Sequence, residues 1–368
     1  SSTSPAPAPA AAEQPRRLSA ADVLSGVALR GEGETVRFPR PLVVGDQEFT
    51  QATVLRDFRT ASRAKLVRLH PSGKCFICKF ADLRQERALM CAVRAMNYRW
   101  RQQGVAVCGV PVEALAYDIT PLDAEVGLVE AVLQSKTLQE LSQDYTAVDR
   151  HLRVVDELRG SPKLLDRLAA TTVGCLTMSY VLGIRDSHDE NLMLRSDGSF
   201  FRVDFGFAFG DTPEIDAPLV FVPQAVAHAL GPSRWAACVA ACGPALMALT
   251  SDNVRTLTVS EPLGLFRSVG EAPPGWDCLR CVPELGPLLG HAKAYVDTLD
   301  CKAFEAEVRR ADEWSLARSA KNTVRQTVRF LTAARDARLP KDWLAALDLS
   351  FLVCQHPAAG GRALAPGR

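Results

Sequence analysis

An ordered set of polar residues between positions 180 and 210 has the composition needed for phosphoryl transfer to a hydroxyl group. Asp186 and His188 come first, Asn191 follows, and Asp204 opens an Asp-Phe-Gly tripeptide. A carboxylate or an imidazole can orient an acceptor hydroxyl and take its proton. An amide oxygen and a second carboxylate are hard ligands suited to the Mg²⁺ that bridges ATP phosphates. The set therefore predicts catalytic residues at 186 and 188 and metal ligands at 191 and 204.

A β-hairpin is the element that must position these groups. Residues 191–194 and 200–203 have strand-like composition, and a Ser-Asp-Gly turn separates them. Asp-Gly favours the positive φ angles that tight hairpin turns require. Because a hairpin brings its two ends together, we expect Asn191 and Asp204 to lie on the same side of it.

The stretch resembles the catalytic and metal-binding loops of the phosphatidylinositol 3-/4-kinase superfamily, which includes related protein kinases and actin-fragmin-kinase-like enzymes. That family carries Gly-x-Asp-Arg-His-x-x-Asn and then Asp-Phe-Gly, and this chain matches it with one extra residue between Gly183 and Asp186. Ser187 stands where the family has arginine, and Phe207 where many members have histidine. Each residue with a direct chemical role is present, so the resemblance implies an active kinase, with a nucleotide-binding pseudokinase as an alternative.

A run of short strand-like segments from Val36 to Lys79 predicts an antiparallel sheet. The loop at residues 56–63 is basic, carries hydroxyl groups and has no glycine. Such a loop is either a solvated turn or a cover for phosphates. The resemblance implies the second, with Arg59 and Ser62 binding ATP.

Lys79 ends the last of these strands, and a helix-like pattern follows from Asp82. An ammonium group beside a helix that carries a carboxylate can hold ATP phosphates. The run is similar to the family's Lys-x-x-x-Asp-Leu-Arg-Gln-Asp, but it is one residue shorter before Asp82 and has Glu86 in place of the final aspartate. The resemblance implies Lys79 as the ATP-phosphate lysine and leaves open which carboxylate, Asp82 or Glu86, pairs with it.

Residues 126–132 have the composition of a core strand and resemble the family's Gly-Leu-Ile-Glu-x-Val hinge. The resemblance implies that the Glu130 carbonyl and the Val132 amide bind the edge of adenine. Main-chain groups are available for this where a strand leaves its sheet. After Thr137 the apolar spacing becomes helical.

The predicted fold class is α+β, a two-lobed protein-kinase-like fold of the phosphatidylinositol 3-/4-kinase type with a small antiparallel-sheet N-lobe and a helical C-lobe. We expect a disordered leader at 1–17, the N-lobe with phosphate loop and hinge at 18–132, the C-lobe with catalytic, metal-binding and activation loops at 133–353, and a disordered tail at 354–368. The absence of an initiating methionine suggests a piece of a longer protein. The implied cofactors are ATP and Mg²⁺, with Mn²⁺ as a substitute.

A net charge of +1 over 368 residues argues against a nucleic-acid partner. Eleven scattered cysteines, no signal-peptide pattern and no apolar run long enough to span a bilayer predict a cytoplasmic setting, with the nucleus as the alternative. The pairs Cys75/Cys78 and Cys278/Cys281 have a spacing seen in zinc sites. However, the first lies in a strand-like run and the second lacks a nearby partner pair, which argues against a metal.

The acceptor is predicted from residues 211–223, where family members have the activation segment. This segment carries three acidic residues and no Lys or Arg. Because each cation near an anionic membrane contributes about 1 kcal/mol, its charge slightly favours a protein Ser/Thr acceptor over a lipid. Phosphatidylinositol carries a single phosphate, so a phosphatidylinositol 3- or 4-kinase is the alternative. In lipid kinases of the family a helix comparable to residues 340–353 makes a peripheral membrane contact, but docking on the large lobe explains its pattern better.

Overall fold

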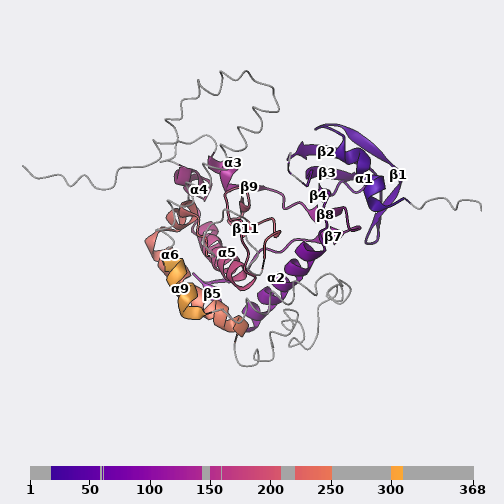
Figure 1. The fold of residues 1–368 in the computed structure, drawn as a ribbon. Helices are drawn as coiled ribbons and strands as arrows, with labels where there is room; N and C mark the ends of the chain where they lie inside the picture. The colour runs from indigo at the N-terminus through magenta and orange to yellow at the C-terminus, as the bar shows by residue number, and fades with distance from the viewer. Residues whose placement is uncertain are drawn as a thin grey trace, which may run out of the picture. The chain divides into compact units, whose positions relative to one another are not determined.

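The computed structural model describes residues 18–58, 60, 62–142, 150–158, 160–208, 220–250 and 300–309. These residues form two compact units, which are described separately (Figure 1). The predicted leader and tail, Arg59, most of the activation segment, the cysteine pair at 278 and 281 and the segment 340–353 lie outside the described residues.

The first unit contains the described residues up to Arg87 together with Tyr117–Ala131. Its antiparallel sheet has the strand order β1-β2-β3-β4-β8-β7. The strands are β1 (Thr35–Val44), β2 (Gln47–Asp57), β3 (Lys65–His70), β4 (Cys75–Lys79), β7 (Ile119–Pro121) and β8 (Gly127–Glu130). Helix α1 (Ala20–Ala28) covers the sheet and buries Leu24 and Val27 against strand residues such as Phe49 and Val67. The predicted antiparallel sheet is confirmed.

The second unit contains residues 88–116 and the described residues from 132 onward. Its helices are α2 (Arg84–Gln102), which begins in the first unit, α3 (Leu138–Ser142), α4 (Arg150–Leu158), α5 (Pro162–Val181), α6 (Gln224–Thr250) and α9 (Cys301–Arg309). Its strands are β5 (Ala106–Val107), β6 (Val110–Pro111), β9 (Ser135–Thr137), β10 (Leu192–Arg195) and β11 (Phe200–Arg202). Helix α6 bends at Gly231, which has a φ angle of 69°.

Helix α5 is the centre of the second unit, with α6 on one side and strand β11 on another (Figure 1). Every residue of α5 from Leu168 to Val181 is buried. A helix that is buried around its whole circumference lies inside the core of its unit. The sheet-rich and helix-rich units together give the predicted α+β, two-lobed kinase-like fold.

The segment 88–116 belongs to the second unit, whereas the sequence-based division assigned it to the N-lobe. The Trp100 indole on α2 donates to the carbonyl of Ala245 on α6 at 2.9 Å. Residues 110–117 have strand-like composition, but only Val110 and Pro111 form a strand, β6. The side-chain nitrogen of Asn97 donates to the Ala114 carbonyl at 2.7 Å, and the side-chain oxygen accepts a bond from the Ala114 N–H at 2.8 Å. These two bonds take the place of the backbone pairing that a strand would make.

No helix in the described part of the chain has the length and apolar character to cross a membrane.

Candidate active site

The catalytic hairpin consists of β10 and β11, paired antiparallel with Leu192 opposite Arg202. Just beyond this pair, the backbone N–H of Val203 donates to the Asn191 carbonyl at 2.9 Å. This bond joins the residue before Asp204 to Asn191. The prediction that the two ends of the hairpin meet is therefore confirmed.

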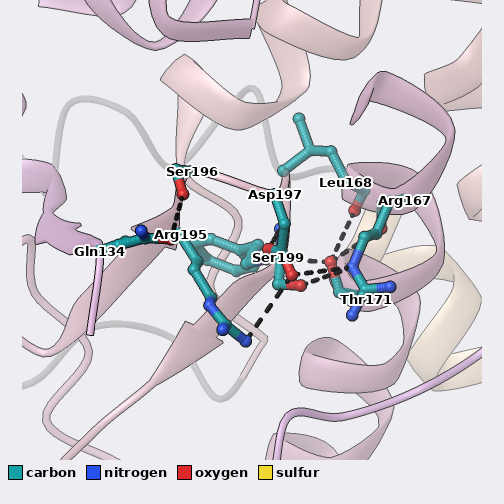
Figure 2. A network of polar contacts seen from close by, with 9 residues as sticks. Gln134, Arg167, Leu168, Thr171, Arg195, Ser196, Asp197 and Ser199 are labelled. Atoms are coloured by element: carbon teal, nitrogen blue, oxygen red, sulfur yellow. Dashed lines mark hydrogen bonds and ion pairs between the residues drawn. The ribbon is translucent and has the colours of Figure 1, made fainter. Parts of the chain in front are cut away.

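The turn end of the hairpin is fixed to helix α5 by polar contacts (Figure 2). Arg167 on α5 donates from Nε to Ser199 Oγ at 2.7 Å, and the same nitrogen lies 3.5 Å from Asp197 Oδ2. The N–H of Phe200 donates to Thr171 Oγ1 at 2.9 Å, inside the core. These bonds set the position of the hairpin relative to the buried helix.

The turn itself fits closely against the start of α5. Gly198 has a φ angle of +86°, and a Cβ atom added there would lie 2.4 Å from the Leu164 carbonyl oxygen. Burial raises the pKa of the Asp197 carboxyl, but bonds from Ser199 and the charges of Arg167 and Arg195 outweigh it and bring the pKa below its usual value. A charged Asp197 therefore stabilises this turn.

The catalytic loop places Asp186 next to His188. Asp186 has a φ angle of 59°, and its Oδ2 atom lies 3.4 Å from Nε2 of His188. The N–H of Glu190 donates to His188 Nδ1 at 3.2 Å, so Nδ1 is the acceptor and the ring proton is assigned to Nε2, facing the carboxylate. The His188 side chain is 3% exposed and that of Asp186 is 20% exposed. Asp186 is thus the member of the pair that an acceptor reaches more easily.

The two predicted metal ligands differ in their surroundings. Asn191 is buried, and its side-chain nitrogen donates to the Asp186 carbonyl at 3.1 Å, so Oδ1 is the atom suited to a cation. Asp204 is exposed at a φ angle of 68°, while its neighbour Phe205 is fully buried and anchors the loop. The described residues hold no group of three or more His, Cys, Asp or Glu that could bind a metal. An amide and a carboxylate fit a Mg²⁺ ion whose other ligands are phosphate oxygens and water.

The predicted phosphate loop of the first unit joins β2 to β3, and hydrogen bonds or ion pairs hold its described residues at both sides. At its base, Lys65 Nζ lies 3.0 Å from Asp57 Oδ2. Further along, the Ser62 carbonyl accepts a bond from the Phe80 N–H at 2.9 Å. Because Phe80 directly follows Lys79, this bond keeps the loop close to the predicted phosphate lysine.

Glu86, and not Asp82, is the carboxylate that pairs with Lys79. The Lys79 ammonium lies 3.1 and 3.2 Å from the two Glu86 oxygens, and both side chains are largely buried. Asp82 instead bonds the guanidinium of Arg84, which holds the pKa of Asp82 below its usual value. The alternative left open by the sequence is settled by this geometry.

The comparisons with known proteins match the part of the chain that carries the hairpin. Residues 157–271 match the family model "Phosphatidylinositol 3- and 4-kinase". The chain contains a kinase domain of the phosphatidylinositol 3-/4-kinase superfamily. Within the family match lie Asp186, His188, Asn191 and Asp204.

Curated relatives are phosphatidylinositol 3-kinases. Phosphatidylinositol 3-kinase age-1 of Caenorhabditis briggsae is 27% identical over 162 residues, covering 35% of this chain and 14% of the relative. Phosphatidylinositol 3-kinase VPS34 of Saccharomyces cerevisiae is 28% identical over 155 residues, covering 41% and 17%. VPS34 of Arabidopsis thaliana is 26% identical over 165 residues, covering 44% and 20%. The chain thus spans no more than a fifth of the length of these relatives.

The predicted adenine hinge stays a prediction. Strand β8 ends at Glu130, whose N–H donates to the Asp118 carbonyl at 2.7 Å. The chain then leaves the sheet, and the Val132 carbonyl accepts a bond from Ser135 Oγ at 2.6 Å. Strand β8 ends at Glu130 and a connecting segment follows at Val132, as expected for a hinge of this superfamily.

Arg202 is the residue of this kinase domain that sequence reasoning missed. Its guanidinium is buried beneath the catalytic loop and bonds Ser187 and the Arg185 carbonyl. The signal in the sequence was the serine at position 187, where the superfamily has arginine. That difference indicated only that the arginine side chain of the family is missing at position 187. Spacing along the sequence could not show that Arg202 on β11 places a guanidinium beside Ser187.

Proposed function

We propose that this chain is a phosphatidylinositol kinase, which transfers the γ-phosphoryl group of ATP to a hydroxyl of the inositol ring. The observation that carries the proposal is the backbone bond from Val203 to Asn191, which joins the residue before Asp204 to Asn191 at one end of the hairpin. Phosphoryl transfer depends mainly on positioning and charge stabilisation, and this arrangement supports both.

Each residue has a distinct part in the proposed reaction. Asp186 orients the acceptor hydroxyl and takes its proton, and His188 lies beside it, with Nε2 3.4 Å from the Asp186 carboxylate. Asn191 Oδ1 and Asp204 would hold Mg²⁺, which neutralises charge on the phosphates when bound. Lys79, oriented by Glu86, contacts the ATP phosphates.

The lipid acceptor is supported by the relatives, which are named as phosphatidylinositol 3-kinases. A protein Ser/Thr acceptor was favoured slightly by the acidic charge of residues 211–223 and is the second candidate. Phosphatidylinositol has a single phosphate, so its binding makes a modest demand on cations. The family relationship therefore outweighs the charge of one segment.

The test is ATP turnover with Mg²⁺ by the purified protein, offered phosphatidylinositol vesicles and a protein extract in parallel. We expect wild-type protein to label the lipid, and Asp204→Ala to lower turnover about a thousandfold, since a metal ligand and its charge are lost. Chromatography of the product then identifies the 3- or 4-phosphate.

Three results would contradict the proposal. Labelled protein bands without labelled lipid would favour the protein acceptor. Near-normal turnover in Asp204→Ala would remove the metal role of Asp204. ATP binding without labelling of either acceptor would favour a pseudokinase.

A further inference from the structure

We propose that Arg202 is a positioning residue for the catalytic aspartate, and that it supplies from strand β11 the guanidinium that position 187 lacks. The inference rests on the proposed function for its kinetic part. Its structural part concerns the geometry of the loop around Asp186 and is independent of turnover.

Arg202 clamps the catalytic loop on both sides of Asp186. One terminal nitrogen donates to Ser187 Oγ at 3.0 Å, and the other donates to the Arg185 carbonyl at 2.7 Å. Arg202 itself is 2% exposed. A buried charge is tolerated only where hydrogen bonds replace its hydration, so the guanidinium and the loop hold each other in place.

The two bonds from Arg202 flank a residue with an unfavourable backbone conformation. Asp186 has a φ angle of 59°, in the left-handed region that non-glycine residues rarely adopt. Such a conformation persists only when the surrounding structure fixes it. The two bonds from Arg202 fix the residues immediately before and after the strained position.

The same strand positions the metal loop. Arg202 lies two residues before Asp204, and the intervening Val203 bonds the Asn191 carbonyl. A further bond runs from the Arg185 N–H to the Phe207 carbonyl at 3.1 Å. Strand β11 and the residues that follow it are therefore bonded to the loop around Asp186, and Arg202 makes the side-chain contact.

Helix α5 borders the guanidinium on another side. Burial raises the pKa of the Cys175 thiol to about 11, although the charge of Arg202 acts in the opposite direction. The Cys175 thiol is therefore neutral at pH 7 and does not neutralise the positive charge of Arg202. Arg202 thus connects the central helix, the hairpin and the catalytic loop.

A lysine cannot reproduce this clamp, because one ammonium group lacks the rigid fork that reaches two separate acceptors. Arg202→Lys therefore keeps the charge and loses the geometry. Arg234→Lys is the matched control: Arg234 on α6 donates to Asp166 on α5 at 2.8 Å, within the same unit and away from the catalytic loop.

The kinetic test compares these two variants with wild type under saturating acceptor. We expect Arg202→Lys to lower kcat at least tenfold with the KM for ATP within twofold, and Arg234→Lys to keep both within twofold. Thermal melting of both variants corrects for any loss of folded protein. A kcat for Arg202→Lys within twofold of wild type, or a loss no larger than its unfolded fraction, would overturn the proposal.

Amide hydrogen exchange tests the clamp without any turnover. We expect exchange in residues 183–191 to rise about tenfold in Arg202→Lys and less in Ser187→Ala, which retains the bond to the Arg185 carbonyl. Unchanged exchange in this segment would overturn the inference. If the wild-type protein labels no acceptor but the exchange changes as expected, the proposed function fails and the positioning role stands.

Discussion

The two units hold their functional groups in different ways. In the second unit, Asp186 and Asp204 both adopt positive φ angles, and the buried Arg202 side chain bonds the residues on both sides of Asp186. In the first unit, the Lys79 ammonium is paired with the side-chain carboxylate of Glu86. The residues predicted to meet the reacting atoms thus depend on an unusual backbone conformation, whereas the predicted phosphate lysine depends on a side-chain ion pair.

The largest effect is expected where the catalytic hairpin meets α5. Gly198→Ala should destabilise the second unit by about 2–4 kcal/mol, because the new Cβ would strike the Leu164 carbonyl and the φ angle is unfavourable. Gly73→Ala is the control: Gly73 has a φ angle of +74° and nothing within 4 Å of the added Cβ, so its loss should be about 1 kcal/mol.

Chemical denaturation of the two glycine variants measures this difference. Equal losses of unfolding free energy in Gly198→Ala and Gly73→Ala would show that the close packing of the hairpin on α5 has no energetic weight.

A smaller effect is expected in the first unit from Glu86→Gln. Loss of the charge that orients Lys79 should lower kcat/KM for ATP about tenfold, which corresponds to about 1.4 kcal/mol. Asp82→Asn removes a carboxylate four residues earlier that bonds Arg84 instead, and it should leave kcat/KM within twofold. Steady-state kinetics with varied ATP decides between them, and a larger loss in Asp82→Asn would reverse the assignment.

The smallest effect is expected from Asp197→Asn, about 0.5 kcal/mol at pH 7, because solvent screens the charges of Arg167 and Arg195. The pKa of Asp197 in the folded state lies below its usual value, so the carboxylate stabilises the fold at neutral pH. This contribution disappears as the pH falls through the folded-state pKa. Unfolding free energies of variant and wild type should therefore converge in acid, and a gap that widens there would contradict the prediction.

Local patterns in the sequence predicted the antiparallel sheet, the hairpin and the helical character of the chain after Thr137. Asp-Gly chemistry and two strand-like runs were sufficient for the hairpin, and helical apolar spacing was sufficient for helices such as α5. Sequence patterns failed to predict local structure where a side chain distant in the sequence determines it. Residues 112–117 have strand-like composition, but the amide of Asn97 holds Ala114 out of a ladder.

The candidate site shows the same division. Asn191 and Asp204 were identified because their spacing along one hairpin determines their meeting in space. The sequence did not decide which carboxylate pairs with Lys79. The run from Lys79 to Asp82 is one residue shorter than in the family, and this changes which position of the helix faces the end of the strand. Arg202 was missed because its two acceptors lie 15 and 17 residues away and involve a backbone carbonyl, which has no sequence signature.

Helix α9 bears on how the domain can be shortened for expression. Phe304 and Val308 are fully buried, and the ring of Phe304 stacks on that of Tyr180 with centroids 4.5 Å apart. The Tyr180 hydroxyl also accepts a bond from the Asp300 N–H at 3.2 Å. The family match ends at residue 271. A truncation there would remove Phe304 and expose the ring of Tyr180, which lies three residues before Gly183. The folded unit therefore extends at least to Arg309, and a shorter piece would expose apolar surface that favours aggregation.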